Sequence, residues 1–232
     1  DSNASLLPHL LTRKAPFSVV STGTWVVMLA VGGDAVELDE TRDTLVNVNA
    51  LGDPVPSARF MGGRAFSMLV GDEPPPASPE AEARVLAAGS MLLPSVPGGS
   101  GPFPFVAPRW TVEEERLTPA ERLAAVSFHL ALMTATCLDL IGARGEIIVE
   151  GPFAANAAYL RMLAAATGRP VLANRLSSTG TSLGAACLVA GARIRTGAEA
   201  FAEAIPPAYF DYAREWQRLT AEHVRDSGER KR

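Results

Sequence analysis

Short apolar runs that favour β-strands come first in this chain, and longer runs with helical spacing follow. Residues 17–22 and 24–31 are rich in β-branched side chains, which predicts two strands joined tightly at Gly23. Residues 44–51 alternate between apolar and polar positions as a third strand does, and the prolines within 53–56 then break the pattern. This part of the sequence therefore predicts an antiparallel meander of three strands.

Helix-start signals mark the middle of the chain. Ser78, which a proline follows, opens a helix that is expected to extend to about residue 88. Thr118 begins a capping box, and the long apolar helix after it is expected to end near Gly142. Between these helices, residues 94–108 hold too many prolines and glycines for regular structure, which predicts a long surface loop.

Strands and helices alternate in the last third of the chain. Residues 146–151 are continuously apolar apart from their ends, as in a parallel strand that is covered on both faces. The segments after it are predicted, in order, as a helix over 154–167, a strand over 171–174, a small-residue helix after 178–181 and a final helix over about 207–225. Three antiparallel strands followed by this alternation are typical of a ribonuclease-H-like domain, the repeating half of the actin-like ATPases. We expect a mixed α/β fold with a five-stranded sheet and helices on both faces.

Composition and charge narrow the class of protein. With 232 residues, 47% of them hydrophobic, the chain can bury a full core as one large domain or two small ones, and we expect a single domain over residues 1–232. The net charge of −4 offers no basic face for nucleic acid, and residues 226–232 are expected to be a frayed tail. The chain opens without Met and without a signal peptide, which suggests a piece of a longer protein. The most apolar stretch, 124–142, contains a histidine and an aspartate, which favours a buried helix over a membrane span.

Cysteine and histidine give no sign of a metal site. Cys137 and Cys187 both fall in apolar helical patterns, which favours buried, reduced thiols and a cytoplasmic location. His9, His129 and His223 are scattered without the spacing of metal ligands, so we expect each of them to have a structural or surface role.

The first candidate for chemistry is the hairpin Ser21-Thr22-Gly23-Thr24. Gly23 allows a backbone conformation that other residues avoid and lets a ligand approach closely. The hydroxyls of Ser21, Thr22 and Thr24, with the N–H groups of the turn, suit the outer oxygens of a nucleoside triphosphate. The same residues also suit an ordinary hairpin whose threonines cap their own turn. Both interpretations stay open on these residues alone.

Two further turns with glycine precede helices. Gly151 ends a buried strand, which places its turn at the carboxyl edge of the sheet, where open α/β sheets bind ligands. Asn156 lies near the N-terminus of the next helix and could hydrogen-bond an adenine or a ribose, or could face water as a helix-start residue. Gly62 and Gly63 precede the short helix expected within 59–70, where a packing or turn role is the default interpretation.

Two more features have structural interpretations beside functional ones. A second Ser-Thr-Gly-Thr occupies residues 178–181, where Thr179 or Thr181 is expected to cap a helix whose Gly184 allows close packing. Asp1 could cap a small-residue helix, or could present a carboxylate into a cleft from a helix N-terminus.

Four segments together resemble the C-terminal domain of the FGGY carbohydrate kinases. DSNAS at residues 1–5 resembles the end of the family segment G-x-[HN]-D-[ST]-x-[AS], and SVVSTGTWVVML resembles its S-S-G-T-W hairpin. VEGPFAANAAYLRMLAAATGRPV resembles the adenosine segment G-G-G-x-x-N…G-x-P-V, and STGTSLGAACLVAG resembles the following E-A-[TS]-A-L-G-A-A helix. The Asp-Ser start and STGTW are most similar to the branch that includes the L-rhamnulose and L-fuculose kinases.

The resemblance implies transfer of a phosphoryl group from ATP, with Mg²⁺, to a small sugar such as a ketose or deoxyketose. It implies that Asp1 is the catalytic base and that Thr22, Gly23 and Thr24 hold the β- and γ-phosphates. Gly151 and Asn156, with Gly62 and Gly63, are implied to line the adenosine pocket. The partner implied is the protein's own N-terminal kinase domain, which carries most of the sugar pocket; a homodimer is compatible with it, and neither nucleic acid nor membrane is expected.

The chain departs from the family pattern at the adenosine turn, which reads Glu150-Gly151-Pro152 in place of three glycines. This difference leaves a rival interpretation open, in which a non-catalytic nucleotide- or sugar-binding regulator or an actin-like assembly module uses the same fold. The Asp at position 1 argues against the rival, since a binding module has no need of a base.

Overall fold

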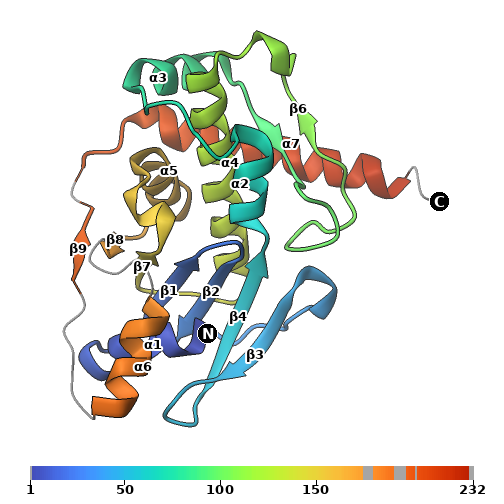
Figure 1. The fold of residues 1–232 in the computed structure, drawn as a ribbon. Helices are drawn as coiled ribbons and strands as arrows, with labels where there is room; N and C mark the ends of the chain where they lie inside the picture. Colours follow the sequence, from blue (N-terminus) through green and yellow to red (C-terminus); the bar gives the residue numbers. More distant parts are fainter. Residues whose placement is uncertain (1, 175–179, 191–196, 202, 230–232) are drawn as a thin grey trace.

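A seven-stranded mixed sheet forms the centre of the protein in a computed structural model that describes residues 2–174, 180–190, 197–201 and 203–229 (Figure 1). The strand order is β3-β4-β2-β1-β7-β8-β9, in which β1 and β7, and β7 and β8, are parallel and the other neighbours antiparallel. The strands are β1 Phe17–Thr22, β2 Val26–Val31, β3 Thr44–Val48, β4 Pro54–Phe60, β7 Glu146–Glu150, β8 Val171–Asn174 and β9 Ala198–Ala200. The fold class is confirmed, but the expected number of five strands is too small.

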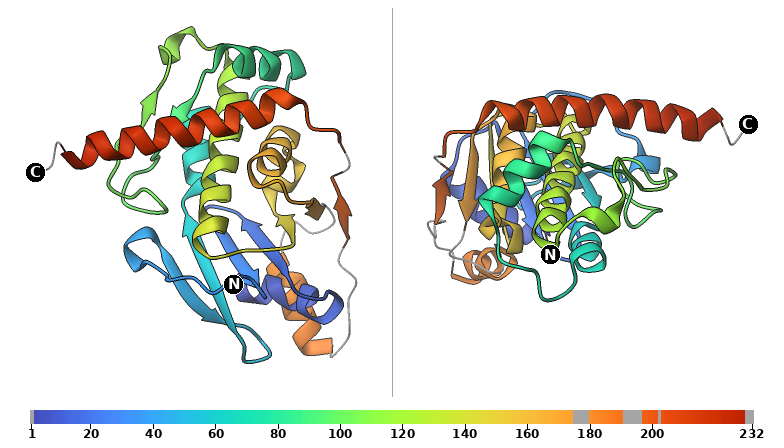
Figure 2. Two further views of the ribbon diagram at one scale, coloured as in Figure 1. Left: turned by 180° about the vertical axis from the view of Figure 1, so that it is seen from behind. Right: turned by 90° about the horizontal axis from the view of Figure 1, so that it is seen from above.

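The helices cover both faces of this sheet, as expected, and Figure 2 shows the layers from two more sides. They are α1 Ser2–Thr12, α2 Gly62–Val70, α3 Pro79–Ala88, α4 Pro119–Leu140, α5 Ala157–Thr167, α6 Gly180–Ala190 and α7 Pro207–Glu229. Helix α1 packs on one face, with α6 against it, while α4 and α5 pack on the other face and in turn contact α2 and α7. A separate two-stranded ribbon pairs β5 Leu92–Leu93 with β6 Arg109–Trp110.

Alternation along the strands divides the core between these layers. In β1, Val19 belongs to the cluster under α1, while its neighbour Val20 belongs to the larger cluster under α4. Ile148 and Ile147 divide in the same way in β7. Successive side chains of a strand point to opposite faces, so a strand that is apolar at every position is buried on both sides.

Strand β4 is the main difference from the predicted meander. The prolines of 53–56 were expected to end the strand pattern, yet Pro54 and Pro56 both lie in β4, which separates β3 from β2. β2 pairs only with residues 57–60 of β4. At Pro54 and Pro56, β4 therefore has a neighbour on the β3 side but none on the side that faces β2. A missing N–H at an edge costs no ladder hydrogen bond, which is why prolines are tolerated there. The short helix expected after the glycines of 59–70 begins at Gly62 itself, so both glycines lie inside α2.

Helix α4 confirms the predicted capping box and the predicted burial. The Thr118 side chain accepts a hydrogen bond from the Glu121 N–H, and the Glu121 carboxylate accepts one from the Thr118 N–H. By length and composition α4 could cross a membrane, but 78% of its most apolar 18-residue window is buried inside the protein. It is therefore the core helix that the sequence predicts.

The long C-terminal helix corrects one boundary. Helix α7 extends to Glu229, so residues 226–229, which were expected to belong to a frayed tail, are helical. Its buried Trp216 donates a hydrogen bond from the indole N–H to the Leu92 carbonyl, and His223 lies 2.7 Å from the Ala107 carbonyl oxygen. The first contact holds α7 against β5, and the second fastens the segment 94–108, which has no helix or strand, as predicted. Cys137 and Cys187 are free and buried, as expected.

Candidate functional site

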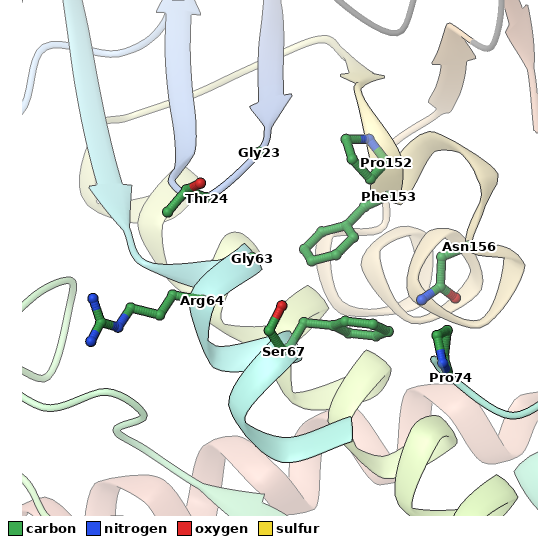
Figure 3. Close-up of a pocket in the computed structure, with 10 residues that line it drawn as sticks. Gly23, Thr24, Gly63, Arg64, Ser67, Pro74, Pro152, Phe153 and Asn156 are labelled. Atoms are coloured by element: carbon green, nitrogen blue, oxygen red, sulfur yellow. The ribbon is translucent and has the colours of Figure 1, made fainter. Parts of the chain in front are cut away.

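A cavity of about 700 Å³ opens at the carboxyl edge of β1 and β7 (Figure 3). Three segments meet there: the β1–β2 hairpin, the N-terminal half of α2 and the turn that follows β7. The lining residues are Gly23, Thr24, Gly63, Arg64, Phe66, Ser67, Pro74, Pro152, Phe153 and Asn156. Four residues that the sequence singled out thus meet in one place, although the first and last are 133 positions apart: Gly23, Thr24, Gly63 and Asn156.

The hairpin presents Gly23 and Thr24 as exposed residues at the cavity wall. The Gly23 N–H donates to the Trp25 carbonyl at 2.9 Å, directly after the Thr22–Val26 pair. The expectation that Gly23 adopts a conformation closed to other residues is wrong, because its φ is not in the left-handed range. Gly23 instead leaves open space at the cavity wall, because a Cβ added there would meet only the Trp25 oxygen within 4 Å, at 3.8 Å. Within the described part of the chain, no hydrogen bond engages the Thr24 hydroxyl.

Thr22 lies behind the cavity wall, and its side chain is buried. Its hydroxyl donates to the Glu150 carbonyl and accepts the Phe153 N–H at 3.1 Å, so it fastens β1 to the turn after β7. Gly151 completes this contact: it has φ +80°, and a Cβ there would lie 2.0 Å from the Thr22 carbonyl oxygen. Thr22 and Gly151 therefore shape the wall from behind, whereas Gly23 and Thr24 face the space.

The two glycines at the start of α2 bring this helix against the hairpin. A Cβ on Gly63 would lie 2.0 Å from the Gly23 carbonyl oxygen, and one on Gly62 would lie 2.5 Å from Cγ2 of Val26. Gly62 is buried and serves packing, which was the default interpretation, while Gly63 also lines the cavity. No side chain caps the N-terminus of α2. The Arg64 N–H donates to the Thr24 carbonyl at 3.3 Å, so the N–H groups of Gly62 and Gly63 are the ones at this helix start that are suited to an anion.

Asn156 lines the cavity, but both ends of its amide are used within the protein. Its Oδ1 accepts the Tyr159 N–H at 3.1 Å, as the N-cap of α5, and its Nδ2 donates to the Ser127 hydroxyl of α4 at 2.9 Å. The structure therefore shows the helix-start role that the sequence left open, with the side chain turned to a neighbouring helix rather than to water.

Several lining residues were not singled out in the sequence. Phe66 and Phe153 form an aromatic wall, with ring centroids 5.8 Å apart, and Ser67 follows Gly63 by one helical turn. The helical spacing of Gly63 and Ser67 could have identified Ser67, because residues four apart share a face. Arg64 is the one cation in the lining, and Figure 3 shows its side chain extending away from Phe153 and Asn156.

Two of the predicted features fall wholly or partly outside the described residues. Asp1 lies outside them, as do residues 178 and 179 of the second Ser-Thr-Gly-Thr. Helix α6 begins at Gly180, which agrees with a helix start in this repeat. A Cβ on Gly184 would lie 1.7 Å from the Ala4 carbonyl oxygen, which confirms the close packing predicted for this helix.

The described residues hold no cluster of three or more His, Cys, Asp or Glu side chains that could bind a metal ion. The three histidines have the structural surroundings that were expected for them. His9 and His129 are buried, and each of the three has a hydrogen-bond partner within the protein.

A ribonuclease-H-like sheet with a cavity at its carboxyl edge defines a domain of the actin-like ATPase class. Residues 14–200 match the family described as carbohydrate kinase FGGY, C-terminal domain. This match spans most of the chain, and the chain therefore belongs to the FGGY carbohydrate kinase family. No curated protein sequence matches the chain.

Solved structures agree with this assignment. A carbohydrate kinase from Novosphingobium aromaticivorans is 34% identical with a TM-score of 0.82, over 94% of this chain and 50% of that one. A xylulose kinase from Rhodospirillum rubrum is 22% identical with a TM-score of 0.66, over 98% and 50%. A Plasmodium falciparum glycerol kinase with ADP is 14% identical with a TM-score of 0.67, over 97% and 50%, and both of these show the fold alone. The chain thus spans about half the length of these relatives, and the matches do not specify the L-rhamnulose or L-fuculose kinase branch.

Proposed function

We propose that this chain supplies the nucleotide site and the catalytic base of a two-domain sugar kinase. The observation that carries the proposal is the cavity where the exposed hairpin, the uncapped start of α2 and an aromatic wall converge. A triphosphate needs N–H and hydroxyl donors at one end and an apolar surface for the base at the other. The cavity offers both at the edge of the sheet where α/β folds bind ligands.

The polar end of the cavity suits the β- and γ-phosphates of ATP. Thr24 contributes a hydroxyl, and Gly23 leaves room for an oxygen to approach the backbone. Gly63 adds the N-terminal turn of α2, whose dipole favours negative charge. Thr22 and Gly151 act indirectly, because they fix the hairpin against the turn after β7.

The proposed reaction transfers the γ-phosphoryl group of ATP to a hydroxyl of a ketose or related sugar, such as L-fuculose or L-rhamnulose. The sugar oxygen bonds to the γ-phosphorus while the bond from that phosphorus to the ADP oxygen breaks. The hydroxyl proton passes to a carboxylate, a role that we assign to Asp1 from its resemblance to the family base. Positioning and charge neutralisation supply most of the rate enhancement in this kind of reaction.

Mg²⁺ accompanies ATP in this class of reaction, but the described residues include no ligand cluster that fits it. We therefore assign no step to the metal in this chain. The protein's own N-terminal half, which the relatives' length implies, is the proposed partner that completes the sugar pocket. We propose a cytoplasmic location for this enzyme, in keeping with its free cysteines.

The test is ketose-dependent ADP formation by the full-length kinase. Asp1→Asn should lower kcat by roughly 10²–10⁴, the usual contribution of a general base, and should leave ATP affinity unchanged. Asp226→Asn on the exposed side of α7 is the matched control and should retain full activity. Unchanged turnover in Asp1→Asn would remove this residue from the mechanism. ATP binding without any sugar-dependent turnover would favour a non-catalytic binding protein instead.

A further inference from the structure

Arg64 is the charged residue among the described residues that line the cavity. We propose that its guanidinium binds the outer phosphates of the nucleotide and makes the site prefer a triphosphate to a monophosphate. This inference rests on the proposed function, since it adds a residue to the phosphate end of the same cavity. Three observations support it: the position of Arg64 on the cavity wall, the exposure of its charge, and its place in a helix.

The backbone holds Arg64 next to the hairpin. Its N–H donates to the Thr24 carbonyl at 3.3 Å, and a Cβ on the preceding Gly63 would lie only 2.0 Å from the Gly23 carbonyl oxygen. The backbone of Arg64 is therefore fixed beside the two hairpin residues that face the cavity. Figure 3 shows its side chain extending away from Phe153, which belongs to the aromatic wall proposed for the base.

The guanidinium of Arg64 is accessible to a ligand. The residue is exposed, and its side chain forms no ion pair or hydrogen bond with the part of the chain that the structure describes. Arg59, five positions earlier, differs in both respects that matter here. Its guanidinium is paired with Asp43 at 3.2 Å and lies over the ring of Trp25, 4.9 Å from the centroid. Arg64 is thus the neighbouring arginine whose charge is left for a ligand.

The charge of Arg64 is the kind that a triphosphate needs. The chain as a whole carries a net charge of −4, whereas the described lining residues include this cation and no carboxylate. Thr24 and the glycine backbone supply uncharged donors, so Arg64 is the lining residue that can offset phosphate charge. A guanidinium presents its N–H donors in a planar fork that matches two phosphate oxygens at once.

The place of Arg64 in α2 is unfavourable for a cation in the absence of a ligand. It is the third residue of a helix whose N-terminus has no side-chain cap. The positive end of the helix dipole favours carboxylates in this turn and disfavours cations. A bound anion would remove this conflict. Sequences break such local rules mainly at functional sites, so the exception supports a role for Arg64 in binding.

The experiment is calorimetric titration of the full-length kinase with ATP and with AMP. Arg64→Gln should weaken ATP about 10–100-fold, the usual contribution of a hydrogen bond to a charged group. AMP should bind unchanged, because it lacks the outer phosphates. Added salt should narrow the difference between wild type and variant for ATP, since the lost contact is an exposed charge pair. Arg109→Gln is the matched control: Arg109 is an exposed arginine of β6 outside the cavity lining, and its loss should change neither affinity.

Thermal unfolding without nucleotide separates this role from a structural one. Arg64→Gln should unfold at a midpoint no lower than that of the wild type, because the helix start loses an unfavourable charge. Equal ATP affinity in wild type and variant would overturn the inference, as would equal weakening of ATP and AMP with a lower midpoint. Both results leave the kinase assignment intact. Failure of the wild type to bind either nucleotide would instead overturn the nucleotide site, and the inference with it.

Discussion

His9 and Glu150 form a buried pair in which the imidazole Nε2 lies 2.8 Å from the carboxylate Oε1. Asn174 donates to the same oxygen at 2.9 Å, so helix α1 is tied to the ends of β7 and β8 at one point. Glu150 immediately precedes Gly151, whose turn forms part of the cavity wall. The pair therefore links the helix at the start of the chain to the strand end that positions the candidate nucleotide site.

Removal of this carboxylate should cost much stability. Glu150→Ala leaves the buried side chains of His9 and Asn174 without their common hydrogen-bond partner, and each buried polar group left unsatisfied costs about 1–3 kcal/mol. Glu146→Ala is the matched control, because Glu146 begins the same strand and pairs with Arg13 just beyond α1, but its side chain is 33% exposed. A partly exposed pair contributes about 1 kcal/mol or less. Urea unfolding measures both changes, and equal losses would show that burial does not decide the difference.

Thr22 should affect nucleotide binding indirectly, by holding the turn after β7 against the hairpin. Thr22→Val removes a hydroxyl that donates to the Glu150 carbonyl and accepts the Phe153 N–H, leaving two buried backbone groups unpaired. We expect a loss of about 1–3 kcal/mol in the free energy of unfolding and weaker ATP binding, because the turn after β7 is released. Thr22→Ser keeps the hydroxyl and should retain both properties. ATP binding that weakens equally in both variants would contradict this reasoning.

Gly63 should not tolerate even alanine. Its Cβ would lie 2.0 Å from the backbone oxygen of Gly23, which cannot move without shifting the hairpin. Alanine improves helix propensity by about 1 kcal/mol, but the steric clash of overpacking, about 1–3 kcal/mol, should prevail. Gly98→Ala is the control, since no atom lies within 4 Å of its added Cβ. Thermal unfolding and ATP titration should show losses for Gly63→Ala alone.

Local signals in the sequence identify most of the elements, and the features they miss depend on contacts between distant residues. Thr118 and Glu121 lie three positions apart, so the start of α4 is visible in the sequence. β4 is not visible, because Pro54 and Pro56 resemble breakers until the register shows that β2 does not reach them. The directions in which the polar side chains of the candidate site point are likewise not visible in the sequence.

Thr22 and Asn156 show this second limit. Both residue types suit a ligand, and both positions adjoin glycine turns, so the sequence left a binding and a structural interpretation open. Their partners, the Phe153 N–H and the Ser127 hydroxyl, are 131 and 29 positions away. Only the packing of α4 and the turn after β7 against these residues determines which way each side chain points.

His129 should make the stability of the protein depend on pH. Burial lowers the pKa of His129 to about 4, although the hydrogen bond with the Leu92 carbonyl acts in the opposite direction. A carbonyl only accepts, so Nδ1 carries the proton of the neutral ring. The unfolded chain takes up a proton near pH 6.5 and the folded protein does so only near pH 4, so stability falls as the pH is lowered between these values.

The expected loss for this histidine is about 2 kcal/mol on going from pH 7 to pH 5, at 1.36 kcal/mol for each unit below the unfolded pKa. Urea unfolding at pH 7, 6 and 5 measures it, in the wild type and in His129→Asn, whose amide can still donate to the Leu92 carbonyl. The variant should be less stable at pH 7 but should lose this part of the pH dependence, because asparagine at position 129 does not titrate. The Glu121 carboxylate, whose pKa is lowered to about 2 by its hydrogen bond with Arg84, contributes only below this range. Parallel pH profiles for the two proteins would show that a different group is responsible.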